Sequence, residues 1–263
     1  MLNWREASGL LIDLDGTLFR GSRPLQGALE FMQIVQREEI PYVYWTNNST
    51  RTPEEVAVHL ASLGFVAPRE RVYSSAMAIS AALLEDLQPG ARVFVLGEGG
   101  LRTELARSFT VIGPEEEGAD AVAMGLDRFA TYARFRAAVH CLLDDALFVA
   151  SNSDRLFPEE DGYAPGAGAL LALLETACGR PARVVGKPSP EFVRSACEQM
   201  GVAVDQAIII GDNPETDIAA AHAAGARGIL VETGVHARMS ALSVRADLAV
   251  RDLGVLAALP LNP

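Results

Sequence analysis

Basic residues and long apolar runs are both scarce in this chain of 263 residues. No apolar stretch reaches the roughly 18 residues that would suggest a membrane span, so we expect no membrane partner. The 22 basic residues are outnumbered by 34 acidic ones, whereas a face that neutralises duplex phosphates must be basic. We therefore expect no nucleic-acid partner, although one local site can reverse the overall sign and bind a small phosphorylated metabolite.

Cysteine is also rare, and the three present lie far apart without metal-ligand spacing: Cys141, Cys178 and Cys197. The first six residues lack the basic-then-apolar layout of a secretory signal. Both observations favour a cytoplasmic protein with reduced thiols. The 23 glycines and 14 prolines follow no period, and 49% of the residues are hydrophobic. This composition argues against collagen-like sequence and against disorder.

Short apolar runs alternate with longer helical patterns along almost the whole chain. The expected strands are Gly9–Leu14, Tyr42–Thr46, Val72–Ser74, Arg92–Leu96, Ala121–Met124, Leu147–Ala150, Ala207–Ile210, Gly228–Val231 and Leu248–Val250. The expected helices are Leu25–Glu38, Pro53–Leu63, Ala76–Leu87, Thr131–Leu142, Pro165–Cys178, Pro190–Met200 and Pro214–Ala224. Several apolar runs have no polar face, as is typical of buried parallel strands. The alternation indicates an α/β fold with a doubly wound parallel sheet.

Polar clusters lie between an extended segment and a helix start at three places, Thr52-Pro53, Ser189-Pro190 and Asn213-Pro214. In each, a residue suited to helix capping precedes a proline at the first helical position. Ligands bind at the carboxyl edge of an open α/β sheet, where such clusters lie. We therefore expect the chemistry of this protein at that edge.

Two hinge candidates, residues 85–91 and 177–183, enclose a segment of about 100 residues, which is long enough to form a domain. The segment has its own alternation of strands and helices. We expect an α/β domain inserted over residues 79–182, with the core formed by residues 1–78 and 183–263.

Two aspartates follow the first expected strand directly, in Asp13-Leu14-Asp15-Gly16-Thr17. If the strand continued, its alternation would place Asp13 and Asp15 on the same side. Neighbouring carboxylates repel each other unless a cation or a proton lies between them. An aspartate-rich turn is the alternative interpretation, because Asp-Gly pairs are common in turns.

A second acidic pair, Asp212 and Asp217, lies at the end of one expected strand and in the first turn of the next helix. Carboxylates offered from separate loops suit a hard cation such as Mg²⁺, which typically bridges to a substrate phosphate. In the alternative interpretation, Asp217 complements the helix dipole and Asp212 caps a turn. That alternative explains one of the two aspartates well, but it explains the presence of both poorly.

Two further clusters suit an anion. Thr46 ends an expected strand and Asn47 follows it, at a place where hydroxyl, amide and backbone N–H groups can form a cradle. Lys187 follows an apolar pair, and the flanking glycine and proline stiffen the loop that presents it. Each signal is weak alone, and most polar loops and lysines are only solvated. Together, the four clusters supply the groups for phosphoryl transfer through a covalent aspartyl-phosphate.

The four clusters resemble, in order, the four motifs of the haloacid dehalogenase (HAD) superfamily: Asp13–Thr17, Thr46–Asn48, Lys187 and Gly211–Ile218. Further segments are similar to subclass IIA, the NagD-like, p-nitrophenylphosphatase-like and phosphoglycolate phosphatase-like group: residues 93–97, 125–127, 150–154, 165–168 and 233–235. The resemblance covers nearly the whole chain. It implies a Rossmann-like HAD core with an α/β cap domain between the second and third motifs, where the insertion is expected.

The resemblance also implies roles for the two aspartates of the first motif. Asp13 would attack the substrate phosphorus, and Asp15 would act as general acid and then as general base. In the superfamily, a carboxyl two residues after the nucleophile accompanies phosphatases and phosphomutases. Asp15 therefore favours phosphate ester hydrolysis over dehalogenation.

The same resemblance implies a phosphate site and a metal site. Thr46, the Asn47 backbone and Lys187 would hold the transferring phosphoryl group. The implied Mg²⁺ ligands are the Asp13 carboxylate, the Asp15 carbonyl oxygen and Asp212, with Asp217 in the outer shell.

The segment of residues 152–163 follows an expected strand of the cap and is interpreted as a loop. In subclass IIA such a cap loop closes over the active site and selects the substrate, which would involve Asp154, Arg155 and Phe157. The arginine favours an anionic leaving group. A connection without a function is the alternative, but long loops in compact domains are often functional.

We therefore expect a Mg²⁺-dependent HAD phosphatase that hydrolyses a small phosphomonoester. Two alternatives remain open. One is a phosphotransferase or phosphomutase that passes the same phosphoryl group to a sugar hydroxyl, and the other is a non-enzymatic phosphate-sensing module. Relatives often associate through their caps, so we also expect a homodimer.

Overall fold

The structure is a computed structural model, and it describes residues 2–159, 162–234 and 244–259. The described residues form two compact units. Unit 1 is drawn from Met1–Thr46, Val56–Tyr73 and Lys187–Pro263, and unit 2 from Asn47–Glu55 and Ser74–Gly186. Within the described ranges, no helix is long and apolar enough to cross a membrane. The domain boundaries expected at residues 79 and 182 stay predictions.

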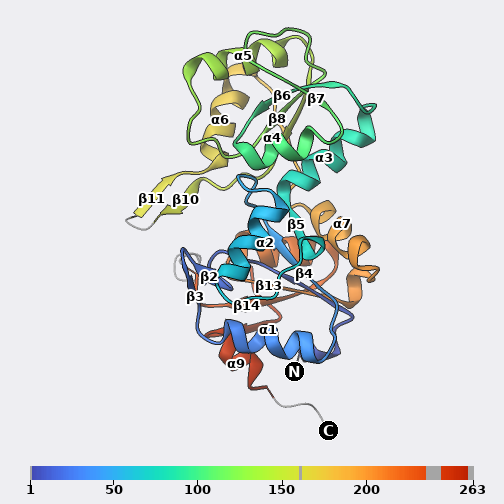
Figure 1. Ribbon diagram of the computed structural model, residues 1–263, viewed down its shortest axis with the longest axis vertical. Helices are drawn as coiled ribbons and strands as arrows, with labels where there is room; N and C mark the ends of the chain where they lie inside the picture. Colours follow the sequence, from blue (N-terminus) through green and yellow to red (C-terminus); the bar gives the residue numbers. More distant parts are fainter. Residues whose placement is uncertain (1, 160–161, 235–243, 260–263) are drawn as a thin grey trace. The chain divides into compact units, whose positions relative to one another are not determined.

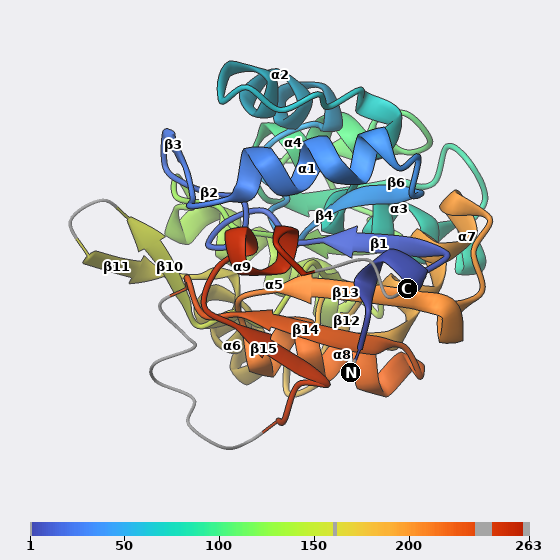
Figure 2. The same ribbon diagram turned by 90° about the horizontal axis from the view of Figure 1, so that it is seen from below.

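Unit 1 is built on a six-stranded sheet in the order β15-β14-β13-β1-β4-β5 (Figures 1 and 2). Its strands are β1 (Gly9–Ile12), β4 (Tyr42–Thr46), β5 (Val72–Ser74), β13 (Ala207–Gly211), β14 (Arg227–Val231) and β15 (Leu248–Val250). The pairs of β1 with β4 and β13, and of β14 with β13 and β15, are parallel. Every residue of β1, β4 and β13 is buried, which explains why their sequences are apolar on both faces.

Helices cover both faces of this sheet. The main helices of unit 1 are α1 (Ala28–Arg37), α2 (Pro53–Ser62, whose first three residues belong to unit 2), α7 (Pro190–Met200), α8 (Ala219–Ala224) and α9 (Leu253–Ala257). Figure 1 shows α1 and α9 side by side, and Phe31 of α1 shares a buried cluster with Tyr44 of β4. Trp45, the next residue of β4, points to the opposite face and packs against Phe192 of α7, with ring centroids 4.9 Å apart. The predicted Rossmann-like doubly wound fold is confirmed.

Unit 2 has a parallel five-stranded sheet of its own, in the order β12-β9-β8-β6-β7. Its strands are β6 (Arg92–Leu96), β7 (Thr110–Ile112), β8 (Ala121–Met124), β9 (Leu147–Ala150) and β12 (Arg183–Val184). Its helices are α3 (Ser75–Asp86), α4 (Gly99–Leu105), α5 (Tyr132–Leu143) and α6 (Ala167–Cys178). Residues of α5 and α6 share one buried cluster with alternate residues of β6 and β8, and α3 packs against α4. Unit 2 is therefore an α/β structure with its own core.

Two sequence-based expectations were wrong in detail. The segment expected as a loop after β9 forms an antiparallel hairpin of β10 (Leu156–Glu159) and β11 (Gly162–Pro165), and residues 160–161 lie outside the described residues. Its strands are short and include prolines, so the sequence carried no clear alternation. The helix expected over residues 214–224 begins as a π-helix, Pro214–Ile218, and becomes regular only in α8. Hydrophobic periodicity cannot distinguish such a single wide turn from an α-helical one.

Smaller elements escaped the sequence pattern because they are too short to show a period. They are η1 (Trp4–Glu6), β2 (Phe19–Arg20), β3 (Arg23–Pro24), η2 (Arg69–Arg71), β7, α4, β12, η3 (Val204–Gln206) and α9. The capping residue expected before Pro53 is present, and it forms a capping box: the Thr52 and Glu55 side chains each accept a hydrogen bond from the other residue's backbone N–H.

Candidate active site

Three neighbouring strands of unit 1 bring polar residues to one edge of the sheet. Asp13 follows β1 directly, Thr46 is the last residue of β4, and Asp212 follows β13. Because β13, β1 and β4 are adjacent and parallel, their carboxyl ends lie at the same edge. The chain crosses from β1 to β4 on one side and returns through β13 on the other, so this edge is a topological switch point of the sheet. All three side chains are buried.

A second contribution to this edge comes from Asp217 and Lys187. Carboxylate oxygens of Asp13, Asp212 and Asp217 lie within 4.8 Å of one another. The Lys187 ammonium donates hydrogen bonds to Asp13 Oδ1 at 2.5 Å and to Asp217 Oδ1 at 2.7 Å. The second oxygen of Asp13 accepts a hydrogen bond from the Thr17 hydroxyl at 3.0 Å. The orientation of the Asp13 carboxylate is thus fixed from both of its oxygens.

Burial and charge together shift the pKa values of this cluster. Burial raises the pKa of Asp212 well above its usual range, and the charges of Asp13 and Asp217 raise it further. Burial raises the pKa of Asp217 to about 6, against the opposing effect of the Lys187 ammonium. Burial lowers the pKa of Lys187, but the charges of Asp13 and Asp217 outweigh this effect and hold that pKa above its ordinary value. The two carboxylates therefore favour the charged form of Lys187.

The acidic cluster fits a divalent cation. Three carboxylates face one ammonium group, so full ionisation leaves two negative charges without compensation. Two glycines lie so close to the Asp212 carboxylate that neither leaves room for a side chain. A Cβ added at Gly16 would lie 2.5 Å from Asp212 Oδ2, and a Cβ added at Gly234 would lie 1.6 Å from the same oxygen. Gly16 also has a φ of +95°, which disfavours other residues. Carboxylate oxygens are the ligands that Mg²⁺ and Ca²⁺ prefer.

Two predicted site residues do not belong to this buried cluster: one is exposed, and the other belongs to unit 2. Asp15 is exposed, on the turn that continues from β1, and its backbone forms an isolated bridge with Phe19. The alternation expected for Asp13 and Asp15 does not apply, because β1 ends at Ile12. Asn47 directly follows Thr46 but belongs to unit 2, where its side-chain amide donates a hydrogen bond to Asp154 Oδ2 at 3.1 Å.

The remaining residues predicted for substrate selection lie near the hairpin of unit 2. Arg155 is exposed, and Phe157 is half-buried in β10. The Arg128 guanidinium lies 5.9 Å from the centroid of the Phe157 ring. Arg128 also forms a two-pronged ion pair with Glu98, with both N···O distances at 2.8 Å, and these bonds lower the pKa of Glu98. The Arg128 charge in unit 2 is thus already compensated by Glu98.

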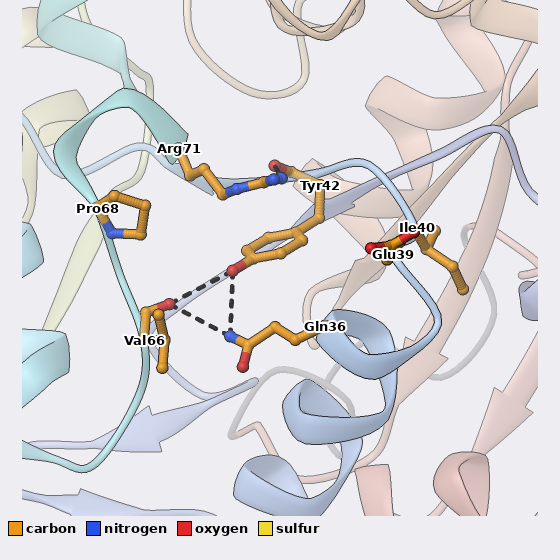
Figure 3. A pocket seen from close by; sticks show the side chains of 7 residues that line it. All are labelled: Gln36, Glu39, Ile40, Tyr42, Val66, Pro68 and Arg71. Atoms are coloured by element: carbon orange, nitrogen blue, oxygen red, sulfur yellow. Dashed lines mark hydrogen bonds between the residues drawn. The ribbon is translucent and has the colours of Figure 1, made fainter.

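A separate hollow in unit 1 lies at the amino end of β4 and contains none of the acidic cluster (Figure 3). It is lined by Gln36, Glu39, Ile40, Tyr42, Val66, Pro68 and Arg71. Its polar groups bond to one another: the Gln36 amide donates to the Tyr42 hydroxyl at 3.1 Å, and Arg71 donates to the Tyr42 carbonyl oxygen at 3.1 Å. Tyr42 begins β4 and Thr46 ends it, so this hollow is distinct from the candidate active site.

Comparison with known proteins identifies the family. Two family models match, a haloacid dehalogenase-like hydrolase over residues 10–108 and a HAD-hydrolase-like model over residues 184–256. The 5'-nucleotidase YutF of Bacillus subtilis is 36% identical over 230 residues, which cover 88% of this chain and 89% of the relative. The chain belongs to the haloacid dehalogenase-like hydrolases.

Solved structures of HAD proteins extend this likeness to the whole fold. The glycerol phosphate phosphatase of Mycobacterium tuberculosis, in complex with magnesium, is similar with a TM-score of 0.90 and 35% identity over 98% of this chain and 79% of that one. NagD of E. coli is similar with a TM-score of 0.84 and 31% identity over 94% of this chain and 97% of that one. The predicted place in HAD subclass IIA is confirmed.

One aromatic partner in this HAD site was not predicted from the sequence. The Lys187 ammonium lies 4.3 Å from the centroid of the Trp45 ring, and both side chains are almost fully buried. The ammonium lies over the ring, so the face of the indole makes the contact, and the indole N–H has no hydrogen-bond partner within the described residues. Lys187 stands out in the sequence, because it is the only lysine among 263 residues. Trp45 does not stand out, because it lies within the apolar run Tyr42–Trp45 of an expected buried strand.

Proposed function

We propose that this protein is a Mg²⁺-dependent phosphatase that hydrolyses a small phosphomonoester through a covalent phosphate on Asp13. The observation that carries the proposal is the buried cluster in which the Asp13 carboxylate, fixed by Lys187 and Thr17, lies beside Asp212 and Asp217. The names of the relatives, 5'-nucleotidase and glycerol phosphate phosphatase, confirm the enzyme class of phosphoric monoester hydrolases. The substrate is a small phosphorylated metabolite.

Two aspartates carry out the chemical steps, Asp13 as the nucleophile and Asp15 as the general acid and base. An Asp13 oxygen forms a bond to phosphorus as the bond from phosphorus to the ester oxygen breaks. Asp15 gives its proton to the departing oxygen. Asp15 then takes a proton from the water that attacks the phosphorus, which releases phosphate and regenerates the Asp13 carboxylate. The exposure of Asp15 on its turn supports this role, because a general acid that serves a departing alcohol and an incoming water must be reached by both.

The phosphoryl group carries negative charge, and three groups of this chain are assigned to it. These are the Lys187 ammonium, the Thr46 hydroxyl at the end of β4 and the backbone N–H of Asn47. Donors fixed before the reaction stabilise developing charge without having to reorient during it. The Lys187 ammonium meets this condition, since two carboxylates and the Trp45 ring hold it.

The residues that would hold Mg²⁺ are Asp13, Asp15 through its carbonyl oxygen, and Asp212, with Asp217 farther from the ion. When bound, a divalent cation neutralises the carboxylates and lets a dianionic phosphate approach them. Full ionisation of the three carboxylates would leave two negative charges uncompensated by Lys187, which supports this assignment. Asp154, Arg155 and Phe157 are proposed to contact the rest of the substrate, with Arg155 suited to an anionic leaving group.

Removal of the metal is expected to abolish turnover. In p-nitrophenyl phosphate assays, EDTA should reduce the rate to background, and excess Mg²⁺ should restore it. Mg²⁺ should also raise the melting temperature of the substrate-free protein, because it binds the folded carboxylate cluster and not the unfolded chain. Full activity in EDTA would contradict the metal requirement. Product formation that depends on an added sugar would instead indicate a phosphotransferase.

Loss of the Trp45 ring is expected to weaken catalysis. A cation above an aromatic face in a desolvated site contributes about 2 kcal/mol, so Trp45→Leu should lower kcat/KM by about tenfold or more. Trp45→Phe keeps an aromatic face and should lose less. Steady-state kinetics on p-nitrophenyl phosphate compares the two variants, with melting temperatures to correct for packing against Phe192. Equal kcat/KM values for the Leu and Phe variants would show that the ring face does not act on Lys187.

A further inference from the structure

Three residues of unit 2 form a closed ring of hydrogen bonds. The Asn152 side-chain amide donates to the carbonyl oxygen of Asn47 at 3.0 Å. The backbone N–H of Asp154 donates to Asn152 Oδ1 at 3.1 Å, and the Asn47 side-chain amide donates to Asp154 Oδ2 at 3.1 Å. We call this set the Asn47–Asn152–Asp154 ring. It joins the residue after β4 to the segment after β9.

The Asn47 carbonyl oxygen receives a second hydrogen bond, from the Ser75 hydroxyl at 2.6 Å. A carbonyl oxygen has two lone pairs, and both are used here. Ser75 is fully buried and Asn152 is 6% exposed, so water does not compete effectively for these bonds. Asn47 is therefore fixed at its carbonyl oxygen and at its side-chain amide, which leaves little freedom to its backbone.

The same segment of unit 2 also approaches Gly186, the residue before Lys187. The Gly186 N–H donates to the Ser151 carbonyl oxygen at 2.9 Å. A Cβ at Gly186 would lie 2.1 Å from that oxygen and 2.6 Å from Asn47 Oδ1. Only glycine allows this approach. Residues 151–154 thus hold both Asn47 and the residue that precedes Lys187.

We propose that Asn152 is a positioning residue for phosphate binding, because its amide sets the orientation of Asn47 and ties it to Asp154. The inference rests on the proposed function, in which the Asn47 backbone N–H binds the phosphoryl group. Asn152 does not touch the substrate and acts through Asn47. Because Asp154 is also proposed to contact the rest of the substrate, the ring would link substrate selection to phosphate binding.

Inorganic phosphate is the probe for this role. Asn152→Ala should raise the inhibition constant of phosphate and the KM for p-nitrophenyl phosphate by about tenfold each, the effect of one misdirected hydrogen bond. Both constants are independent of the fraction of enzyme that is folded, so a purely structural role would leave them unchanged. Thr103→Ala is the control, since this side chain is exposed in α4 of the same unit, and it should behave as the wild type.

Two further variants keep the inference testable if Asn152→Ala does not fold. Asn152→Asp has the same shape but lacks the donor, and Ser75→Ala removes the other donor to the same carbonyl oxygen. Both should raise the inhibition constant of phosphate severalfold. Asp154→Ala combined with Asn152→Ala should raise the inhibition constant of phosphate no more than Asn152→Ala alone, because either change opens the ring.

The outcomes separate this inference from the proposed function. If the wild type hydrolyses p-nitrophenyl phosphate and the Asn152 and Ser75 variants keep its inhibition constant for phosphate within twofold, the positioning role is wrong and the phosphatase assignment stands. If the wild type does not hydrolyse the ester, the proposed function fails. Calorimetric titration of phosphate into the wild type and variants then decides the positioning role alone.

Discussion

Asp13→Asn is expected to lower kcat for p-nitrophenyl phosphate by about a thousandfold or more, the scale seen when a covalent nucleophile is removed. An amide has nearly the shape of a carboxylate but does not attack phosphorus. The variant should remain folded, because Lys187 keeps its hydrogen bond to Asp217 at 2.7 Å. The substitution also removes one of the three mutually repelling carboxylates.

The matched control for this substitution is Asp205→Asn. Asp205 is exposed in η3 and lies outside the acidic cluster, so its variant should have the wild-type kcat. Circular dichroism and thermal melting of both variants show whether the fold is kept. A folded Asp13→Asn protein with wild-type turnover would rule out Asp13 as the nucleophile.

Lys187→Met is expected to damage both catalysis and stability. Removal of one partner from a buried ion pair costs about 3–5 kcal/mol, and here two carboxylates lose their common partner. The free energy of unfolding in metal-free buffer should fall by about that amount, measured by urea titration. The loss of one preorganised charge facing the phosphoryl group should lower kcat by about a hundredfold or more. Mg²⁺ should recover more stability in this variant than in the wild type, because the carboxylates then have no other cation within the cluster.

Lys187→Arg is the informative comparison for this prediction. The guanidinium keeps the charge, but it is planar and larger than an ammonium group that fits between two carboxylates and the Trp45 ring. We expect Lys187→Arg to retain part of the stability and little of the activity. Wild-type stability and kcat in Lys187→Met would show that this ammonium is dispensable.

The strand ends of the site could be predicted because composition changes sharply there. Buried parallel strands are apolar on both faces, so Thr46 and Asp212 marked the points where β4 and β13 stop, whereas the strand expected over Gly9–Leu14 ends two residues earlier, at Ile12. Adjacent parallel strands share one carboxyl edge, which is why these residues were expected together. Because β1 ends at Ile12, strand alternation does not extend to Asp13 and Asp15, and the turn leaves Asp13 buried and Asp15 exposed.

Contacts between segments far apart in the chain could not be predicted in this way. Periodicity indicates that Trp45 lies on one face of β4, but not that Lys187 lies across that face. The link between Asn152 and Asn47 joins residues 105 positions apart, and only the folded chain shows it. The π-helix that carries Asp217 depends on backbone bonding, which leaves no trace in residue type.

Mass spectrometry of enzyme quenched in acid during turnover tests most directly whether Asp13 carries the transferred phosphate. Wild-type protein mixed with p-nitrophenyl phosphate and Mg²⁺ should yield a fraction of the peptide around Asp13 with the added mass of one phosphoryl group, localised to Asp13 by fragmentation. Asp13→Asn should yield none. A wild-type enzyme that turns over with this peptide unmodified, and with phosphate on another residue, would contradict the mechanism.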